Sequence, residues 1–152
     1  MWVDERDHVN VLVRRKGSQH FSVFRQSKYG IHGPSLAPVG GFINDGESAL
    51  EAAQRELNEE LGLRADKAHW HTLGSFRVMV NRGGGTLHSF FADQAEPVEV
   101  RGASDDAESQ QLVHLSESEL LDAVLAGEFQ EVKWSATVAL ALLQLRKNAL
   151  GH

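Results

Sequence analysis

The chain has 152 residues, of which 21 are acidic and 15 are basic, a net charge of −6 and no cysteine. The missing cysteines exclude disulfides and thiolate zinc sites, and without an arginine- and lysine-rich run we expect no nucleic acid partner. The N-terminus lacks a basic region followed by an apolar run, and the longest apolar stretch, residues 136–145, is too short to cross a bilayer. We therefore expect one domain over residues 1–152 of a cytoplasmic protein with no membrane partner.

Two apolar, alternating segments near the N-terminus predict a β-hairpin. They are residues 8–14 and 21–26, joined by a polar turn at residues 16–19. Residues 31–38 contain two prolines, so we expect a loop or a sheet edge there. Gly40 and Gly41 follow and lack side chains that would block an approach. We expect their backbone to lie close to a metal ion or a phosphate; the alternative is a plain turn.

Residues 48–61 have the spacing of an amphipathic helix with a defined start and end. Ser48 and Glu51 are spaced as a capping box, and Gly62 stands where a left-handed cap would end the helix. At 3.6 residues per turn, apolar residues gather on one side and acidic residues on the other. The apolar side consists of Leu50, Ala53, Leu57 and Leu61, and the acidic side of Glu56, Glu59 and Glu60. We expect the first side to pack in the core and the second to stay exposed.

The acidic side of this helix calls for a cation, because carboxylates three and four residues apart repel one another. Arg55 lies one turn from both Glu51 and Glu59, so it can pair with either and hold a ligand in orientation. Ligands that are all oxygen favour a hard cation, Mg²⁺ first and Mn²⁺ second. From the residues alone, a solvated acidic helix face is the alternative.

Residues 41–63, GFINDGESALEAAQRELNEELGL, read G, five residues, E, seven residues, R-E-L-x-E-E-x-G-L, and this pattern resembles the signature of the Nudix hydrolases. The resemblance implies that Glu47 and Arg55 hold the loop and the helix in register. It implies hydrolysis of a nucleoside diphosphate linked to another group, with magnesium ions as cofactors. The implied metal ligands are the carboxylates of Glu56, Glu59 and Glu60 and the backbone carbonyl of Gly40, with Glu59, Glu60 and Arg55 as catalytic residues.

Two further strands are predicted after the helix, over residues 69–80 and 86–92. The glycine-rich connection between them, residues 81–85, is either a mobile hairpin tip or a place where the backbone approaches a phosphate or a base. The histidines of this half have no convincing ligand spacing, so we expect strand or surface positions for them. They are His69, His71, His88 and His114.

A polar, acidic segment at residues 97–108 precedes another predicted strand, residues 111–115. Its composition is typical of a solvated loop. Many Nudix enzymes place an additional glutamate in this region, so the resemblance implies a further metal ligand or a general base here. Glu108 is the first candidate and Asp106 the second.

Two helices are predicted at the C-terminal end, over residues 116–126 and 134–145. The first begins with a capping box formed by Ser116 and Glu119, and the second carries apolar residues at helical spacing. We expect both helices to act as packing elements. The element order predicts an α/β fold with a mixed sheet between helical layers, in agreement with the α/β/α sandwich that the Nudix resemblance implies.

Residues outside the motif bear on the substrate. Arg25, Gln26 and Lys28 resemble the segment ahead of the motif in ADP-sugar pyrophosphatases, which implies substrate binding by Arg25, Lys28 and Gly41. The alternative is that Arg25 and Lys28 are ordinary strand-end charges. The leading hypothesis is hydrolysis of an ADP-sugar such as ADP-ribose to AMP and a sugar phosphate, by a chain that could form a homodimer. The alternatives are hydrolysis of nucleoside triphosphates with release of pyrophosphate, and a module that senses a nucleotide without cleaving it.

Overall fold

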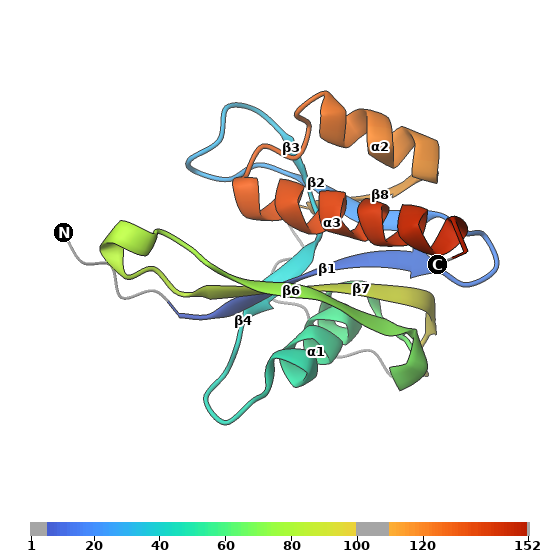
Figure 1. The fold of residues 1–152 in the computed structure, drawn as a ribbon, viewed down its shortest axis with the longest axis horizontal. Coiled ribbons are helices and arrows are strands. Elements are labelled where there is room, and N and C mark those ends of the chain that lie inside the picture. The colour runs from blue at the N-terminus through green and yellow to red at the C-terminus, as the bar shows by residue number, and fades with distance from the viewer. Residues whose placement is uncertain (1–5, 100–109, 152) are drawn as a thin grey trace.

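The computed structural model describes residues 6–99 and 110–151, which form a mixed β-sheet covered by helices on both faces (Figure 1). Helix α1 lies on one face, below the sheet in Figure 1, and α2 and α3 lie on the other. The strands are β1 (His8–Arg15), β2 (Phe21–Gln26), β3 (Ser35–Ala37), β4 (Val39–Phe42), β5 (Leu63–Arg64), β6 (Trp70–Arg77), β7 (Thr86–Pro97) and β8 (Gln110–Leu115). The helices are α1 (Ala49–Leu61), α2 (Glu117–Leu125) and α3 (Val132–Ala149), with short 3₁₀ turns η1 (Lys67–His69) and η2 (Val80–Arg82).

Strand β1 is the centre of the sheet. It runs parallel to β7 along one edge, and along its other edge it pairs antiparallel with β4 from His8 to Val11 but with β2 only at Val13 and Arg14. Strand β2 pairs with β8 along its length, and its C-terminal half pairs with β3. Strands β1 and β2 therefore diverge, and the segment formed by β3, Pro38 and β4 lies between them.

The alternation of side chains along β1 builds a separate core on each face of the sheet. Val9, Val11 and Val13 are fully buried and pack with α1, whereas Leu12 packs with α2 and α3. The side chains at even positions of β1 therefore point toward α3. A polar residue of β1 therefore faces α3 if its number is even and α1 if its number is odd.

An ion pair links β1 to β7 beside the core that packs against α2 and α3. Arg14 donates to both carboxylate oxygens of Asp93, at 2.8 and 2.7 Å, and its guanidinium lies 5.6 Å from the ring centres of Phe21 and Phe91. Burial raises the pKa of Asp93, but the hydrogen bonds from Arg14 and from the backbone N–H of Gln94 outweigh it, so that the pKa is lowered overall.

The predicted mixed-sheet α/β sandwich is confirmed, as are the N-terminal hairpin, the motif helix, the strand before α2 and both C-terminal helices. Residues 31–38 include the short strand β3, which matches the expected sheet edge. Strand β7 continues to Pro97 instead of ending at residue 92, because Glu96 and Pro97 pair with β5, a two-residue strand that was not predicted. Helix α3 begins two residues earlier than predicted, since Glu131 caps it by accepting from Lys133 N. None of the described helices is long and apolar enough to span a bilayer.

Candidate active site

Helix α1 is held at both ends by the residues that predicted it. Ser48 Oγ accepts a hydrogen bond from Glu51 N at 3.1 Å, and Glu51 Oε1 accepts one from Ser48 N at 2.9 Å. Gly62 adopts φ 66° and donates its N–H to Asn58 O at 2.8 Å. Because Glu51 is engaged in the cap, the arginine one turn further on pairs with other carboxylates.

Arg55 is the hub of the acidic cluster. Its guanidinium makes a bidentate pair with Glu47, at 2.8 and 2.9 Å, and also donates to Glu56 at 2.8 Å and to Glu59 at 3.3 Å. A further hydrogen bond of 2.9 Å reaches the carbonyl of Phe42 at the end of β4. One side chain therefore ties the helix to the loop before it and to the adjoining strand, as the resemblance implied for Glu47 and Arg55.

The charged groups of the cluster shift one another's pKa values. The hydrogen bonds from Arg55, aided by the backbone N–H of Asn44, lower the pKa of Glu47 to about 2, and Glu47 in turn raises the pKa of Arg55. Burial raises the pKa of Glu56 despite the hydrogen bond from Arg55, and the charge of Glu59 raises it further. Glu60 acts on Glu56 as well, and its side chain lowers the pKa of Glu56 slightly.

The prediction that the acidic side of α1 stays exposed was wrong. The side chains of Glu56 and Glu59 are only 12% and 33% exposed, because β4 lies across this side of the helix. A Cβ atom at Gly41 would collide with the carboxylate of Glu56, and one at Gly40 would collide with the amide nitrogen of Asn10 and approach Val9 O to 2.9 Å. The two glycines form part of a strand, not a plain turn, and they are small because the carboxylate and the amide need their space.

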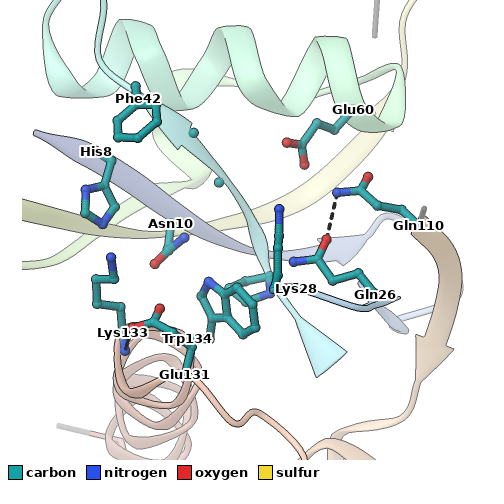
Figure 2. Close-up of a pocket in the computed structure, with 13 residues that line it drawn as sticks. His8, Asn10, Gln26, Lys28, Phe42, Glu60, Gln110, Glu131, Lys133 and Trp134 are labelled. Carbon is teal, nitrogen blue, oxygen red and sulfur yellow. Dashed lines mark hydrogen bonds between the residues drawn. The ribbon is translucent and has the colours of Figure 1, made fainter. Parts of the chain in front are cut away.

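A cavity of about 410 Å³ opens where β1 and β2 diverge (Figure 2). Glu60 reaches it from α1, and the backbone of Gly40 and Gly41 lines it from β4. Lys28 lies at its border after β2, beside Gln26, whose Oε1 accepts a hydrogen bond of 2.8 Å from Gln110 Nε2. The structure therefore brings part of the motif to a pocket large enough for a small ligand.

The site residues that were predicted from the sequence have different positions relative to this cavity. Glu60, Gly40, Gly41 and Lys28 line it, and Glu56 and Glu59 lie on the same stretch of α1 at Arg55. Arg25 is exposed and does not line the cavity, whereas its neighbour Gln26 is buried and does. Glu108 and Asp106, the candidates for a further ligand or base, lie outside the described residues.

Sequence reasoning missed two groups of residues that line the cavity. The first is the even face of β1 with its partner strand, namely His8, Asn10 and Phe42. The second is the start of α3, namely Glu131, Lys133 and Trp134; α3 packs in the core as predicted, and its first turn also lines the cavity. A polar residue inside the apolar strand His8–Arg15 was a usable signal for Asn10. The residues of α3 gave no signal, because only the tertiary fold brings them to the motif.

The match to known families decides how this arrangement is interpreted. Residues 4–148 match the NUDIX domain, which is most of the chain. The chain belongs to the Nudix hydrolase family. Members of this family generally act on nucleotides and use divalent metal ions.

Two relatives illustrate how far the likeness extends. The chain is 35% identical over 79 residues to the m7GpppN-mRNA hydrolase NUDT17 of Xenopus laevis, a stretch that covers 49% of this chain and 27% of that protein. The chain thus spans about a quarter of the length of this curated relative. A crystal structure of an ADP compounds hydrolase superposes with a TM-score of 0.79 at 22% identity, over 97% of this chain and 77% of that one, and shares the Nudix fold.

The residues on α1 fit the divalent cation that Nudix enzymes use. The donors are all oxygen atoms, from Glu56, Glu59, Glu60 and the Gly40 carbonyl, and oxygen suits a hard cation. Glu56, Glu59 and Glu60 lie within about one turn of α1, and a cation relieves the repulsion among carboxylates at this spacing. Within the described residues no three His, Asp or Glu side chains converge on one point, since Arg55 holds one oxygen each of Glu56 and Glu59.

Proposed function

We propose that this Nudix protein is a Mg²⁺-dependent hydrolase, with Mn²⁺ as a substitute, that cleaves the diphosphate linkage of a nucleoside diphosphate derivative. The observation that carries the proposal is that Glu60, on the acidic side of α1, reaches a cavity that is also lined by Lys28 and Lys133 (Figure 2). Carboxylates on one side can hold metal ions. Ammonium groups can bind phosphate oxygens whose negative charge those ions do not neutralise.

The reaction consists of one exchange of bonds. The oxygen of a water molecule bonds to one phosphorus, and the bond from that phosphorus to the bridging oxygen of the anhydride breaks. Two phosphomonoesters form, and as dianions they release both protons of the water. The bound divalent ions would supply charge neutralisation of the phosphates and a lower pKa for the attacking water. The protein's own part is to fix its carboxylates, and Arg55 does so through four hydrogen bonds to Glu47, Glu56 and Glu59.

Each residue has a distinct role in this proposal. The metal ligands are Glu56, Glu59, Glu60 and the carbonyl of Gly40, and Arg55 positions them. Lys28 and the backbone at Gly41 bind the phosphates. Arg25 has a smaller part, since its side chain is exposed outside the cavity. Glu108, with Asp106 as the second candidate, supplies a further ligand or the general base.

We place ADP-sugars first among the substrates, with ADP-ribose giving AMP and ribose 5-phosphate. The segment with Gln26 and Lys28 borders the cavity, which supports a role in substrate binding. The structural neighbour of the same fold is described as a hydrolase of ADP compounds. The NUDT17 relative is named for hydrolysis of an mRNA cap, so a cap dinucleotide belongs in any test of specificity.

The test is an analysis of products with and without Mg²⁺. The panel consists of ADP-ribose, ADP-glucose, GDP-mannose, diadenosine polyphosphates, an m7GpppN cap dinucleotide and nucleoside triphosphates. We expect AMP and a sugar phosphate from the ADP-sugars, only with metal. Cleavage of nucleoside triphosphates alone, with release of pyrophosphate, would overturn ADP-sugars as the substrate class and favour the nucleoside triphosphate alternative. Tight nucleotide binding without any cleavage would favour a sensing module.

Three further expectations from the sequence complete the proposal. They are a single domain over residues 1–152, a cytoplasmic location and a homodimer. Light scattering of the purified chain together with limited proteolysis would test the first and the third.

A further inference from the structure

Asn10 is a buried polar residue in the middle of β1. Its side chain is on the α3 face of the sheet, and the residue is 4% exposed. It is paired across the sheet with Gly40 of β4 on one edge and with Ser89 of β7 on the other. The two polar side chains, Asn10 and Ser89, therefore lie next to each other on the same face.

These two neighbours differ in how their polar atoms are satisfied. Ser89 Oγ lies 2.8 Å from Thr137 Oγ1 on α3, so its hydrogen bond is made within the protein. Asn10 Oδ1 is buried and accepts no hydrogen bond from any residue that the structure describes. The amide nitrogen of Asn10 lies against Gly40, where a Cβ atom would collide with it. The acceptor of this carboxamide is thus unused among the described residues.

The unused acceptor belongs to the wall of the cavity. Asn10 is one of the residues that line it, and in Figure 2 its oxygen is turned toward the side of Lys133 and Glu131, away from Glu60. A buried carbonyl oxygen without a donor destabilises a protein, so such a group in a binding cavity indicates that a ligand supplies the donor.

The surroundings of Asn10 define the chemistry of that donor. A carbonyl oxygen repels phosphate oxygens, so the phosphates belong nearer to Glu60, which would hold the divalent ions in the proposed function. Lys133 and Glu131, which line the cavity on this side (Figure 2), carry opposite charges, so the lining gives no net negative charge there that would favour a cationic ligand. The rings of Trp134 and Phe42 line it as well, and flat rings are suited to the nucleoside part of a substrate.

We propose that Asn10 is a specificity-determining residue that accepts a hydrogen bond from a neutral N–H or O–H group on the nucleoside half of the substrate. The donor is either the amino group of the base or a ribose hydroxyl, which share this chemistry. The inference rests on the proposed function for the kind of ligand, but it concerns binding and can be tested without turnover. A site built to bind a substrate's donor discriminates against analogues that lack it.

The first test is calorimetric titration of the wild-type chain with AMP and three analogues that each lack one donor. Purine riboside 5′-monophosphate lacks the amino group, and 2′-deoxy-AMP and 3′-deoxy-AMP each lack one hydroxyl. We expect one analogue to bind about tenfold more weakly than AMP, and its identity reports which donor Asn10 binds. Equal binding of all four nucleotides, or no binding of AMP, would overturn the proposal.

The second test repeats the titration with Asn10→Leu, which has a similar shape but no acceptor. In this variant AMP and the discriminating analogue should bind equally, and Tm should rise by about 2–4 °C because a buried unsatisfied carbonyl is removed. The matched control is Ser89→Ala, which removes a satisfied buried hydroxyl and should lower Tm but leave the preference for AMP unchanged. Unchanged discrimination in Asn10→Leu would refute the role of Asn10.

Two further outcomes separate this inference from the proposed function. If Asn10→Leu does not fold, Asn10→Asp keeps an acceptor at the same place and should retain the preference for the donor-bearing nucleotide; loss of that preference would count against the proposal. If the wild-type chain selects AMP over an analogue, Asn10→Leu loses this selection, and the wild-type chain cleaves nothing in the substrate panel, the proposed function fails and the role of Asn10 stands. If the wild-type chain cleaves ADP-sugars but binds AMP and all three analogues equally, the proposed function stands and the role of Asn10 fails.

Discussion

Replacing Arg55 by methionine tests whether this arginine organises the acidic cluster. The substitution keeps most of the apolar stem but removes five hydrogen bonds, four of them to carboxylates. The carboxylate partners are 15%, 12% and 33% exposed at Glu47, Glu56 and Glu59, so the first two pairs are shielded from water and the third contributes least. Because hydrogen bonds to charged groups contribute about 1.5–3 kcal/mol each and the freed carboxylates partly rehydrate, we expect a loss of about 2–4 kcal/mol in the free energy of unfolding.

Urea denaturation at pH 7 with unchanged m-value measures this loss directly. The control is Arg77→Met, since Arg77 is exposed on β6 and donates one 3.1 Å hydrogen bond to Thr86, so that its replacement should change stability by less than about 0.5 kcal/mol. A loss of less than about 0.5 kcal/mol in Arg55→Met as well would refute the account, because Arg55 would then be an ordinary surface charge.

Three other predictions concern the core, the glycine strand and acid stability. Leu57→Ala should cost about 2–5 kcal/mol in urea denaturation, since Leu57 is fully buried, while the folded fraction keeps its turnover. Gly41→Ala should push the Glu56 carboxylate aside and lower kcat about a hundredfold, whereas Gly30→Ala, in open space, should leave kcat unchanged. Asp93→Asn should lower stability by about 1–2 kcal/mol at pH 7. Because the pKa of Asp93 is lowered in the fold, this difference should persist above about pH 4 and shrink as the pH falls through the folded pKa; a difference that grows with acid would contradict the pairing.

The sequence predicted those parts of the fold whose causes are local. Helix α1 has a capping box at its start and a left-handed glycine at its end, and both signals lie within a few residues of the boundaries they determine. The first hairpin was predicted for the same reason, since alternation and a polar turn are both local patterns. The pairing of β5 with the end of β7 is not local, because it joins residues about 33 positions apart, Leu63 and Arg64 with Glu96 and Pro97.

The candidate site could be predicted only in part, for a related reason. The motif placed the carboxylates and Arg55, because their roles follow from spacing along one helix. It did not predict that β4 covers Glu56, nor that Lys133 and Trp134 reach the cavity, since those contacts depend on how α3 packs across the sheet. Lys28 lines the cavity, and Gln26 does so from the end of β2, whereas Arg25 is exposed because successive residues of β2 face opposite sides.

The most direct test of the central claim is the turnover of Glu60→Gln with Mg²⁺, on the substrate that the panel identifies. Glu60 reaches the cavity from α1, and the substitution removes its charge with almost no change in shape. We expect kcat to fall about a thousandfold or more with the circular dichroism spectrum unchanged, while Glu128→Gln, on an exposed residue, keeps wild-type turnover. Turnover of Glu60→Gln within about threefold of wild type would contradict the assignment of the acidic helix as the catalytic centre.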